Sequence, residues 1–141
     1  MAAPPADVTQ VAQWLSGVGA TLAATANTVR RAADSTALAY RMTRVGLYTH
    51  LVDPPPADAA GKTKVPPPQA NTRKQVEAIA SNQKWSALLE ETESALSQSR
   101  FWLDLHRYSA QALAGLGASH AKAREELLRE LAAVLKRMPS L

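Results

Sequence analysis

The chain has 141 residues, of which 46% are hydrophobic and 20% charged, and this is the composition of a globular protein rather than a disordered one. A single domain is expected, because two domains would each be near the lower size limit for burying a core. The net charge is +4, and the absence of cysteine excludes disulfides, cysteine-bound zinc, iron–sulfur clusters and a thiol nucleophile.

Residues 8–32 are predicted to form the first helix. Asp7 and Gln10 are spaced as in a capping box, and hydrophobic residues then recur at intervals of three and four. The 22 residues between Asp7 and Arg30 carry no charge, and this length could span a bilayer. Threonine, serine, glutamine and asparagine are interspersed among them, so we expect no membrane insertion.

The uncharged outer face of this helix suggests that it is covered. A surface helix normally carries charges opposite its hydrophobic stripe, whereas this one carries only Gln, Ser, Thr, Gly and Ala. Such a helix is either central in its own domain or packed against a second copy of the chain in a two-fold homodimer. The candidate residues of a self-association seam are Val11, Trp14, Leu15, Val18 and Leu22.

A second helix is predicted from Asp34 or Ser35 to Asp53, where three prolines end it. Residues 53–70 follow as a long loop stiffened by two proline triplets. We expect this loop to lie within one helical domain, because the helices before it are too few to form a core alone.

The same loop contains Gly61-Lys62-Thr63, which resembles the end of a phosphate-binding loop. That motif needs a glycine at position 56 and a strand before it, because glycines let the backbone wrap the phosphates. The residue is Pro56 and no strand is predicted, so we expect no nucleotide site there.

Four more helices are predicted in the rest of the chain. The third begins at Asn71 or Thr72, the fourth is capped by Asn82, the fifth runs from Ser99 to the glycines at 115 and 117, and the sixth from Ser119 to Met138. In the fourth helix, Glu90, Glu91 and Glu93 are expected to face solvent. No stretch alternates with period two, so the predicted fold class is all-α: a compact bundle of about six helices with one long proline-rich loop between the second and third.

The charged residues show no pattern typical of catalysis or metal binding. The three histidines, His50, His106 and His120, are far apart in the sequence, and none belongs to a metal-binding motif. We therefore expect no metal, no cofactor, no small-molecule substrate and no enzymatic activity. A local excess of arginine, formed by Arg30, Arg31, Arg41 and Arg44, could bind an anion or nucleic acid, but it is interpreted as a solvated helix face, and no nucleic-acid partner is expected.

A tetratricopeptide repeat is one alternative for Trp102, Leu105 and Tyr108. The repeat requires a glycine at 106 and a tyrosine at 109, and the chain has His106 and Ser109 instead. Helix pairs of this general kind can still stack as in α-solenoids, so a helical adaptor for a protein partner remains the alternative function.

Four segments together resemble the middle region of the type VI secretion proteins called TssA, ImpA or VasJ. They are Ala39-Tyr40-Arg41 with Arg44-Val45-Gly46-Leu47, Gly61-Lys62-Thr63 before Pro66-Pro67-Pro68, Trp85-Ser86-Ala87-Leu88-Leu89, and Arg100-Phe101-Trp102-Leu103-Asp104-Leu105-His106-Arg107-Tyr108. The resemblance extends from about residue 8 to the end of the chain. Its core residues are Tyr40, Trp85, Phe101, Trp102, Leu105 and Tyr108.

The resemblance implies a non-enzymatic structural subunit of the type VI secretion system in the bacterial cytoplasm. Its implied partners are a second copy and, through the full-length protein, components of the baseplate, sheath and tube. We expect residues 1–6 to be disordered or an arbitrary start within a longer protein, residues 7–138 to form the helical domain, and residues 139–141 to begin a linker to a C-terminal domain. This domain would link a baseplate-recruiting domain to a ring-forming one.

Overall fold

Residues 3–51 and 69–139 are described in the computed structural model, and their regular secondary structure is entirely helical. The helices are α1 (Val11–Ala32), α2 (Ala37–Tyr48), α3 (Ala70–Ser81), α4 (Trp85–Ala95), α5 (Asp104–Leu116) and α6 (Ala121–Arg137). Short 3-10 turns, Val8–Gln10 and Ala118–His120, lead into α1 and α6. The predicted all-α fold with six helices is confirmed for these residues, whereas most of the expected proline-rich loop, residues 52–68, lies outside them.

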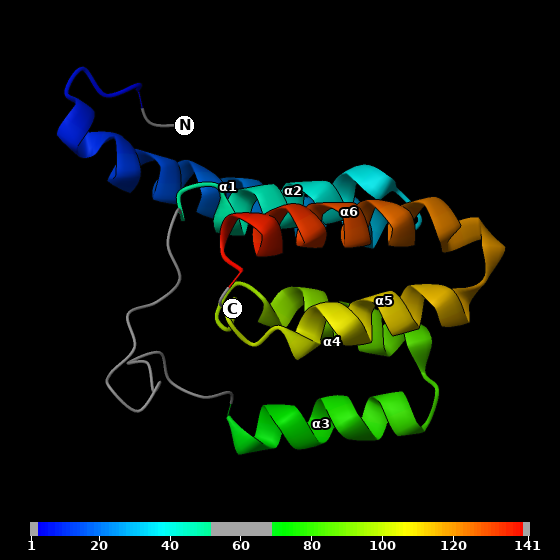
Figure 1. Cartoon of the computed structure of the whole chain (residues 1–141). Coiled ribbons are helices and arrows are strands. Elements are labelled where there is room, and N and C mark those ends of the chain that lie inside the picture. The colour runs from blue at the N-terminus through cyan, green and yellow to red at the C-terminus, as the bar shows by residue number, and fades with distance from the viewer. Residues whose placement is uncertain (1–2, 52–68, 140–141) are drawn as a thin grey trace.

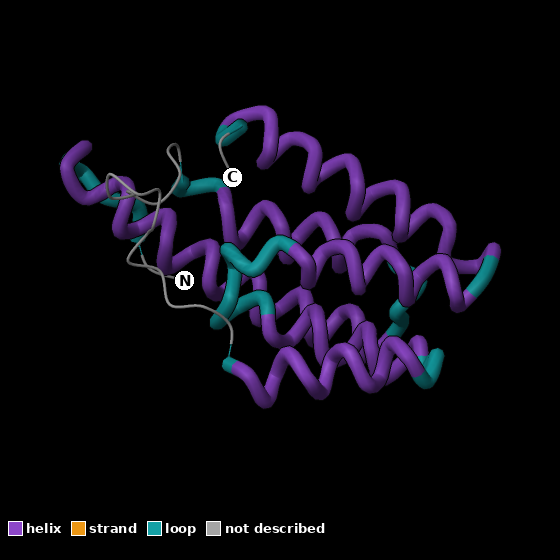
Figure 2. Tube along the Cα trace, turned by 60° about the horizontal axis from the view of Figure 1, so that its bottom comes forward, coloured by secondary structure: helices purple, strands orange, loops and turns teal. Residues whose placement is uncertain are grey.

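The six helices pack in an order that differs from their order in the sequence. Helix α1 packs against α2, α2 against α6, α6 against α5, α5 against α4, and α4 against α3. In Figure 1, α1, α2 and α6 form one layer, α4 and α5 the next, and α3 the far edge. Figure 2 shows the same arrangement from another side. Helix α6, the last in the sequence, therefore lies between α2 and α5.

Two clusters of buried hydrophobic side chains form the core. The first joins Tyr40 of α2 to residues of α3, α4, α5 and α6, and the second joins Leu47 and Tyr48 to Leu105 and the end of α6. Trp102 packs against both clusters and so connects them. Within the described residues, no helix is long and apolar enough to cross a membrane.

The close packing of α1 on α2 depends on two glycines. A Cβ atom added to Gly19 would collide with the backbone carbonyl of Gly46, and one added to Gly46 would collide with the carbonyl of Gly19. The buried line of α1 is consequently made of small residues, namely Gly19, Ala23 and Ala26, and ends at Arg30. The larger hydrophobic residues of the predicted stripe that belong to α1 are half-buried: Val11, Leu15, Val18, Leu22 and Val29. Val8, the first residue of that stripe, is exposed.

Several helix ends differ from the predictions. The fifth helix begins at Asp104 rather than Ser99, because backbone and side-chain hydrogen bonds hold Arg100 against the end of α2. The fourth helix is preceded by Lys84, not capped by Asn82, and Gln83 adopts a positive φ of 55° in the turn before it. Gly117 ends α5 with a φ of 98°, a conformation that favours glycine, whereas Gly115 lies inside the helix.

Candidate functional site

The six core residues of the motif lie in the interior or at its border. Tyr40 and Leu105 are fully buried, and the hydroxyl of Tyr40 donates a hydrogen bond to the carbonyl of Asp34, in the connection between α1 and α2. The other four, Trp85, Phe101, Trp102 and Tyr108, are half-buried. Five of the six, all except Phe101, belong to the buried clusters or pack against them.

Trp85 and Gly115 show this structural role directly. A Cβ atom added to Gly115 would overlap the indole ring of Trp85, so the glycine provides the space in which the first residue of α4 packs on α5. The motif residue Trp85 thus depends on a glycine thirty positions later, which local sequence marks only as a possible end of the helix.

A buried ion pair joins α2 to α4. The guanidinium of Arg44 donates from Nη1 to Oε1 of Glu93 at 2.5 Å and from Nη2 to Oε2 at 2.9 Å. Arg44 is 0% exposed and Glu93 is 1% exposed, so the predictions of a solvated Arg44 and an outward-facing Glu93 are both wrong. The reason is that each side chain is neutralised by the other across the interface between α2 and α4, so neither charge requires hydration.

Ser109 and Thr92 extend this ion pair into α5. The Ser109 hydroxyl donates to Glu93 Oε2 at 2.7 Å and lies 2.7 Å from the hydroxyl of Thr92. Burial raises the pKa of the Glu93 carboxyl, but the charge of Arg44 and the hydrogen bonds outweigh this effect and hold the pKa below its ordinary value. Glu93 is thus an ionised acceptor shared by two helices.

A second polar cluster ties the α4–α5 connection to the end of α2. The Tyr48 hydroxyl donates to the carbonyl of Arg100, and Arg100 Nη1 donates to the carbonyl of Leu47 at 2.8 Å. Because the Tyr48 hydroxyl uses its proton in the bond to Arg100, His106 Nε2 is the donor in the 2.7 Å hydrogen bond to the Tyr48 oxygen. Burial, followed by the nearby charge of Arg44, lowers the pKa of His106 to about 3, so this histidine is neutral at pH 7.

The four arginines of the local basic excess are all paired. Arg30 and Arg31 bind the carboxylate of Glu90, and Arg41 binds Glu126 at 3.0 Å. Hydrogen bonds from Arg31 are the largest of the effects that lower the pKa of the Glu90 carboxyl to about 2. Burial alone would raise this pKa, but its effect is smaller. With Arg44 bound to Glu93, each arginine that suggested an anion site neutralises a glutamate from α4 or α6.

The predicted seam residues lie in the first twelve residues of α1, and the last of them, Leu22, is beside Gly46 of α2. Helix α1 has 22 residues and α2 has 12, so α1 is longer by ~15 Å at 1.5 Å per residue. Its N-terminal part projects past the other helices in Figure 1. All five seam residues are half-buried: Val11, Trp14, Leu15, Val18 and Leu22.

The outer side of α1 is open and made of small residues. Gly17, Ala20, Thr21 and Ala24 are exposed, and no atom lies within 4 Å of a Cβ added to Gly17. The threonine hydroxyl at position 21 donates back to the carbonyl of Gly17 at 3.2 Å, which partly satisfies its polar group without a partner outside the helix. This side of the helix could therefore approach another backbone closely.

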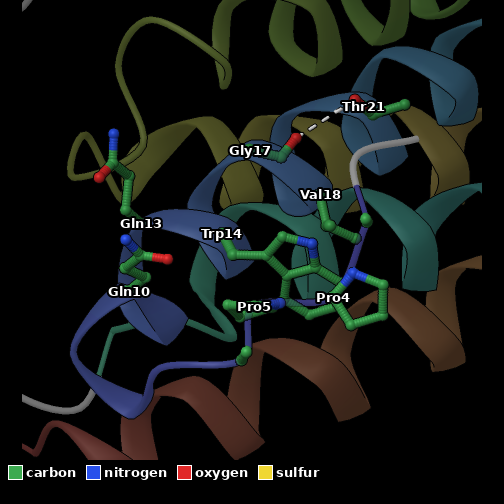
Figure 3. A pocket seen from close by; sticks show the side chains of 10 residues that line it. Pro4, Pro5, Gln10, Gln13, Trp14, Gly17, Val18 and Thr21 are labelled. Atoms are coloured by element: carbon green, nitrogen blue, oxygen red, sulfur yellow. Dashed lines mark hydrogen bonds between the residues drawn. The ribbon is translucent and has the colours of Figure 1, made fainter.

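A pocket of about 570 Å³ lies beside Trp14. Residues 3–6 turn back along α1, and Figure 3 shows the rings of Pro4 and Pro5 next to the indole of Trp14, with Val18 on the next turn. All ten residues that line the pocket are uncharged. Among the described residues, no group of three or more His, Asp or Glu side chains is arranged to hold a metal ion.

Residues 13–141 match a protein family described as type VI secretion, under the names EvfE, EvfF, ImpA, BimE and VasJ. The chain belongs to this type VI secretion family. The match covers all six helices apart from the first two residues of α1, and it includes every motif residue. It excludes residues 3–6, which line the same pocket as Trp14. No curated protein matches the chain.

Proposed function

We propose that this chain is a non-enzymatic assembly subunit of the type VI secretion system and that it acts by self-association along the outer side of α1. In this proposal the helical domain links a baseplate-recruiting domain to a ring-forming domain while tube and sheath assemble in the cytoplasm. Membership of the type VI secretion family supports the assembly role. The uncharged, projecting half of α1 supports self-association.

A two-fold contact between copies suits this surface for an electrostatic reason. In a symmetric dimer each residue near the axis meets its own copy, so a charged residue there would meet a like charge. The absence of charge from Val8 to Val29 avoids this repulsion. The small exposed residues also let two helices pack closely, and weak dimer contacts repeated around a ring would add through avidity.

The helical-adaptor alternative is less well supported by the packing order. In a helical repeat protein each unit packs mainly against its neighbours in the sequence. Here α6 lies between α2 and α5, so the helices do not stack in sequence order. A concave surface of the kind that tetratricopeptide arrays use to bind peptides does not follow from this arrangement.

The proposal predicts that Thr21→Glu separates the copies. Thr21 is exposed on the outer side of α1, so the change leaves the core intact but places two carboxylates near the symmetry axis. Like charges there cost several kcal/mol, and we expect the dimer dissociation constant to rise ~100-fold. Light scattering coupled to size-exclusion chromatography measures the change as a loss of dimer mass.

Gln111→Glu is the matched control, because Gln111 is exposed on α5 and the substitution adds the same charge. We expect this variant to retain the mass of the unaltered chain. A dimer that survives Thr21→Glu would rule out the outer side of α1 as the seam. In cells, the same substitution should reduce the number of assembled sheaths seen by fluorescence microscopy, whereas Gln111→Glu should not.

A further inference from the structure

We propose that the Pro4–Pro5 segment is an intramolecular cap that competes with a second copy of the chain for the surface formed by Trp14 and Val18. This inference rests on the proposed self-association along α1. It adds a regulatory element to that surface, because the same residues are covered by the chain itself in one state and by its copy in the other.

The turn at Asp7 positions the cap. The Asp7 carboxylate accepts a hydrogen bond from the backbone N–H of Thr9 at 3.0 Å, and the Asp7 carbonyl accepts one from the N–H of Gln10. These two bonds start the helical turn and reverse the chain direction just before it. Pro4 and Pro5 are therefore placed along the first turns of α1, beside the indole ring of Trp14 (Figure 3).

The two prolines make a small contact in the cap. Proline has no backbone N–H, so neither Pro4 nor Pro5 can donate a backbone hydrogen bond to the helix. Their saturated rings lie beside the indole of Trp14 (Figure 3). Pro5 is half-buried and Pro4 is exposed, so the two rings bury little apolar surface. A second copy displaces them where its own contact with Trp14 and Val18 is more favourable.

A second copy of the chain is the competitor that fits the surface. The pocket and the outer side of α1 beyond it carry no charge, so a copy can meet them without like-charge repulsion. The exposed residues Gly17 and Thr21 line the same pocket and continue it along the proposed seam. A copy that packs there reaches Trp14 and Val18 only after the prolines leave.

The test replaces both prolines by glycine, which removes the rings and makes the capped conformation entropically costly. We expect the dimer dissociation constant, measured by sedimentation equilibrium, to fall at least threefold. The indole N–H signal of Trp14, identified by its loss in Trp14→Phe, should shift in the NMR spectrum at monomer concentrations. The indole signals of Trp85 and Trp102 should stay in place, because these residues pack against the core clusters and do not line the pocket.

Val8→Ser is the matched control in the same N-terminal segment, since Val8 is 82% exposed and does not line the pocket. It should change neither the Trp14 signal nor the dissociation constant. An unshifted Trp14 signal in the proline variant would overturn the cap. A shifted signal with an unchanged dissociation constant would overturn the competition while leaving the dimer in place. A chain that stays monomeric in every variant would refute the proposed self-association itself.

Discussion

At the residue scale, the main feature is a charge pair placed where a hydrophobic pair would be ordinary. Arg44 and Glu93 lie inside the bundle with no access to water. Such a pair contributes little net stability relative to apolar side chains, because both charges lose their hydration. It does oppose incorrect packing, since any arrangement that separates the two leaves a buried charge alone.

The cost of leaving one buried charge unpaired predicts a large loss of stability when only one of the two charges is removed. Glu93→Gln keeps the shape of the side chain but leaves Arg44 buried without a counter-charge, so we expect a loss of ~3–5 kcal/mol in the free energy of unfolding. Urea denaturation measures it. Glu91→Gln is the control on the same helix: Glu91 is only half-buried, and its substitution should cost ~0.5 kcal/mol or less.

Replacing both partners at once separates the charge effect from general disruption. The double variant Arg44→Met with Glu93→Leu removes both charges and should be more stable than Glu93→Gln alone. Equal destabilisation of the single and the double variants would show that packing around the pair, rather than the unpaired charge, causes the loss.

At the element scale, the contact of α1 with α2 is set by two glycines rather than by large hydrophobic residues. Gly19 and Gly46 face each other so closely that neither can carry a side chain. Gly17, two positions away, faces the outer side of α1 and has no neighbour within 4 Å. The same helix thus contains one glycine required for packing and one that is not.

The two positions predict opposite effects of the same substitution. Gly19→Ala should lower the free energy of unfolding by ~1–3 kcal/mol, because the added methyl group collides with the backbone of α2, which cannot move aside. Gly17→Ala should raise it by ~0.5–1 kcal/mol, because alanine favours the helix. Thermal unfolding followed by circular dichroism measures both. Destabilisation of equal size at the two positions would mean that helix propensity does not explain Gly17.

At the scale of the whole molecule, α3 is the least integrated helix. It packs mainly against α4, and Val76 is its only fully buried residue. The remaining helices are joined by the interleaved position of α6 and by ion pairs between α1 or α2 and α4. A helix with so few buried contacts is expected to open separately from the rest.

Hydrogen exchange tests this expectation. The amide protons of α3 should exchange with an opening free energy ~2 kcal/mol or more below that of α5, which is buried between α4 and α6. Val76→Ala should accelerate exchange in α3 and leave α5 nearly unchanged. If α3 and α5 exchange with the same opening free energy, the six helices unfold together and α3 is not a separate unit.

The sequence by itself determined the helical class, the approximate helix ranges and the absence of charge from Val8 to Val29. These properties depend on local chemistry: Gly117 ends α5, Pro139 follows the end of α6, and spacings of three and four residues mark one side of a helix. The second helix is an exception, because α2 ends at Tyr48 rather than at the predicted Asp53. The same spacing contained a signal for the buried glutamate. Glu93 follows Leu89 by four positions and precedes Leu96 by three, so it shares their inward-facing stripe.

Only the tertiary structure decided what lies opposite each side of a helix. The partner of Glu93 is 49 positions away, at Arg44, and the glycine that accommodates Trp85 lies on another helix. Periodicity shows which residues share a side, but it cannot show which distant side chain neutralises a charge or fills a gap. Whether a charged residue faces water or the core is therefore settled by long-range packing, which local spacing does not encode.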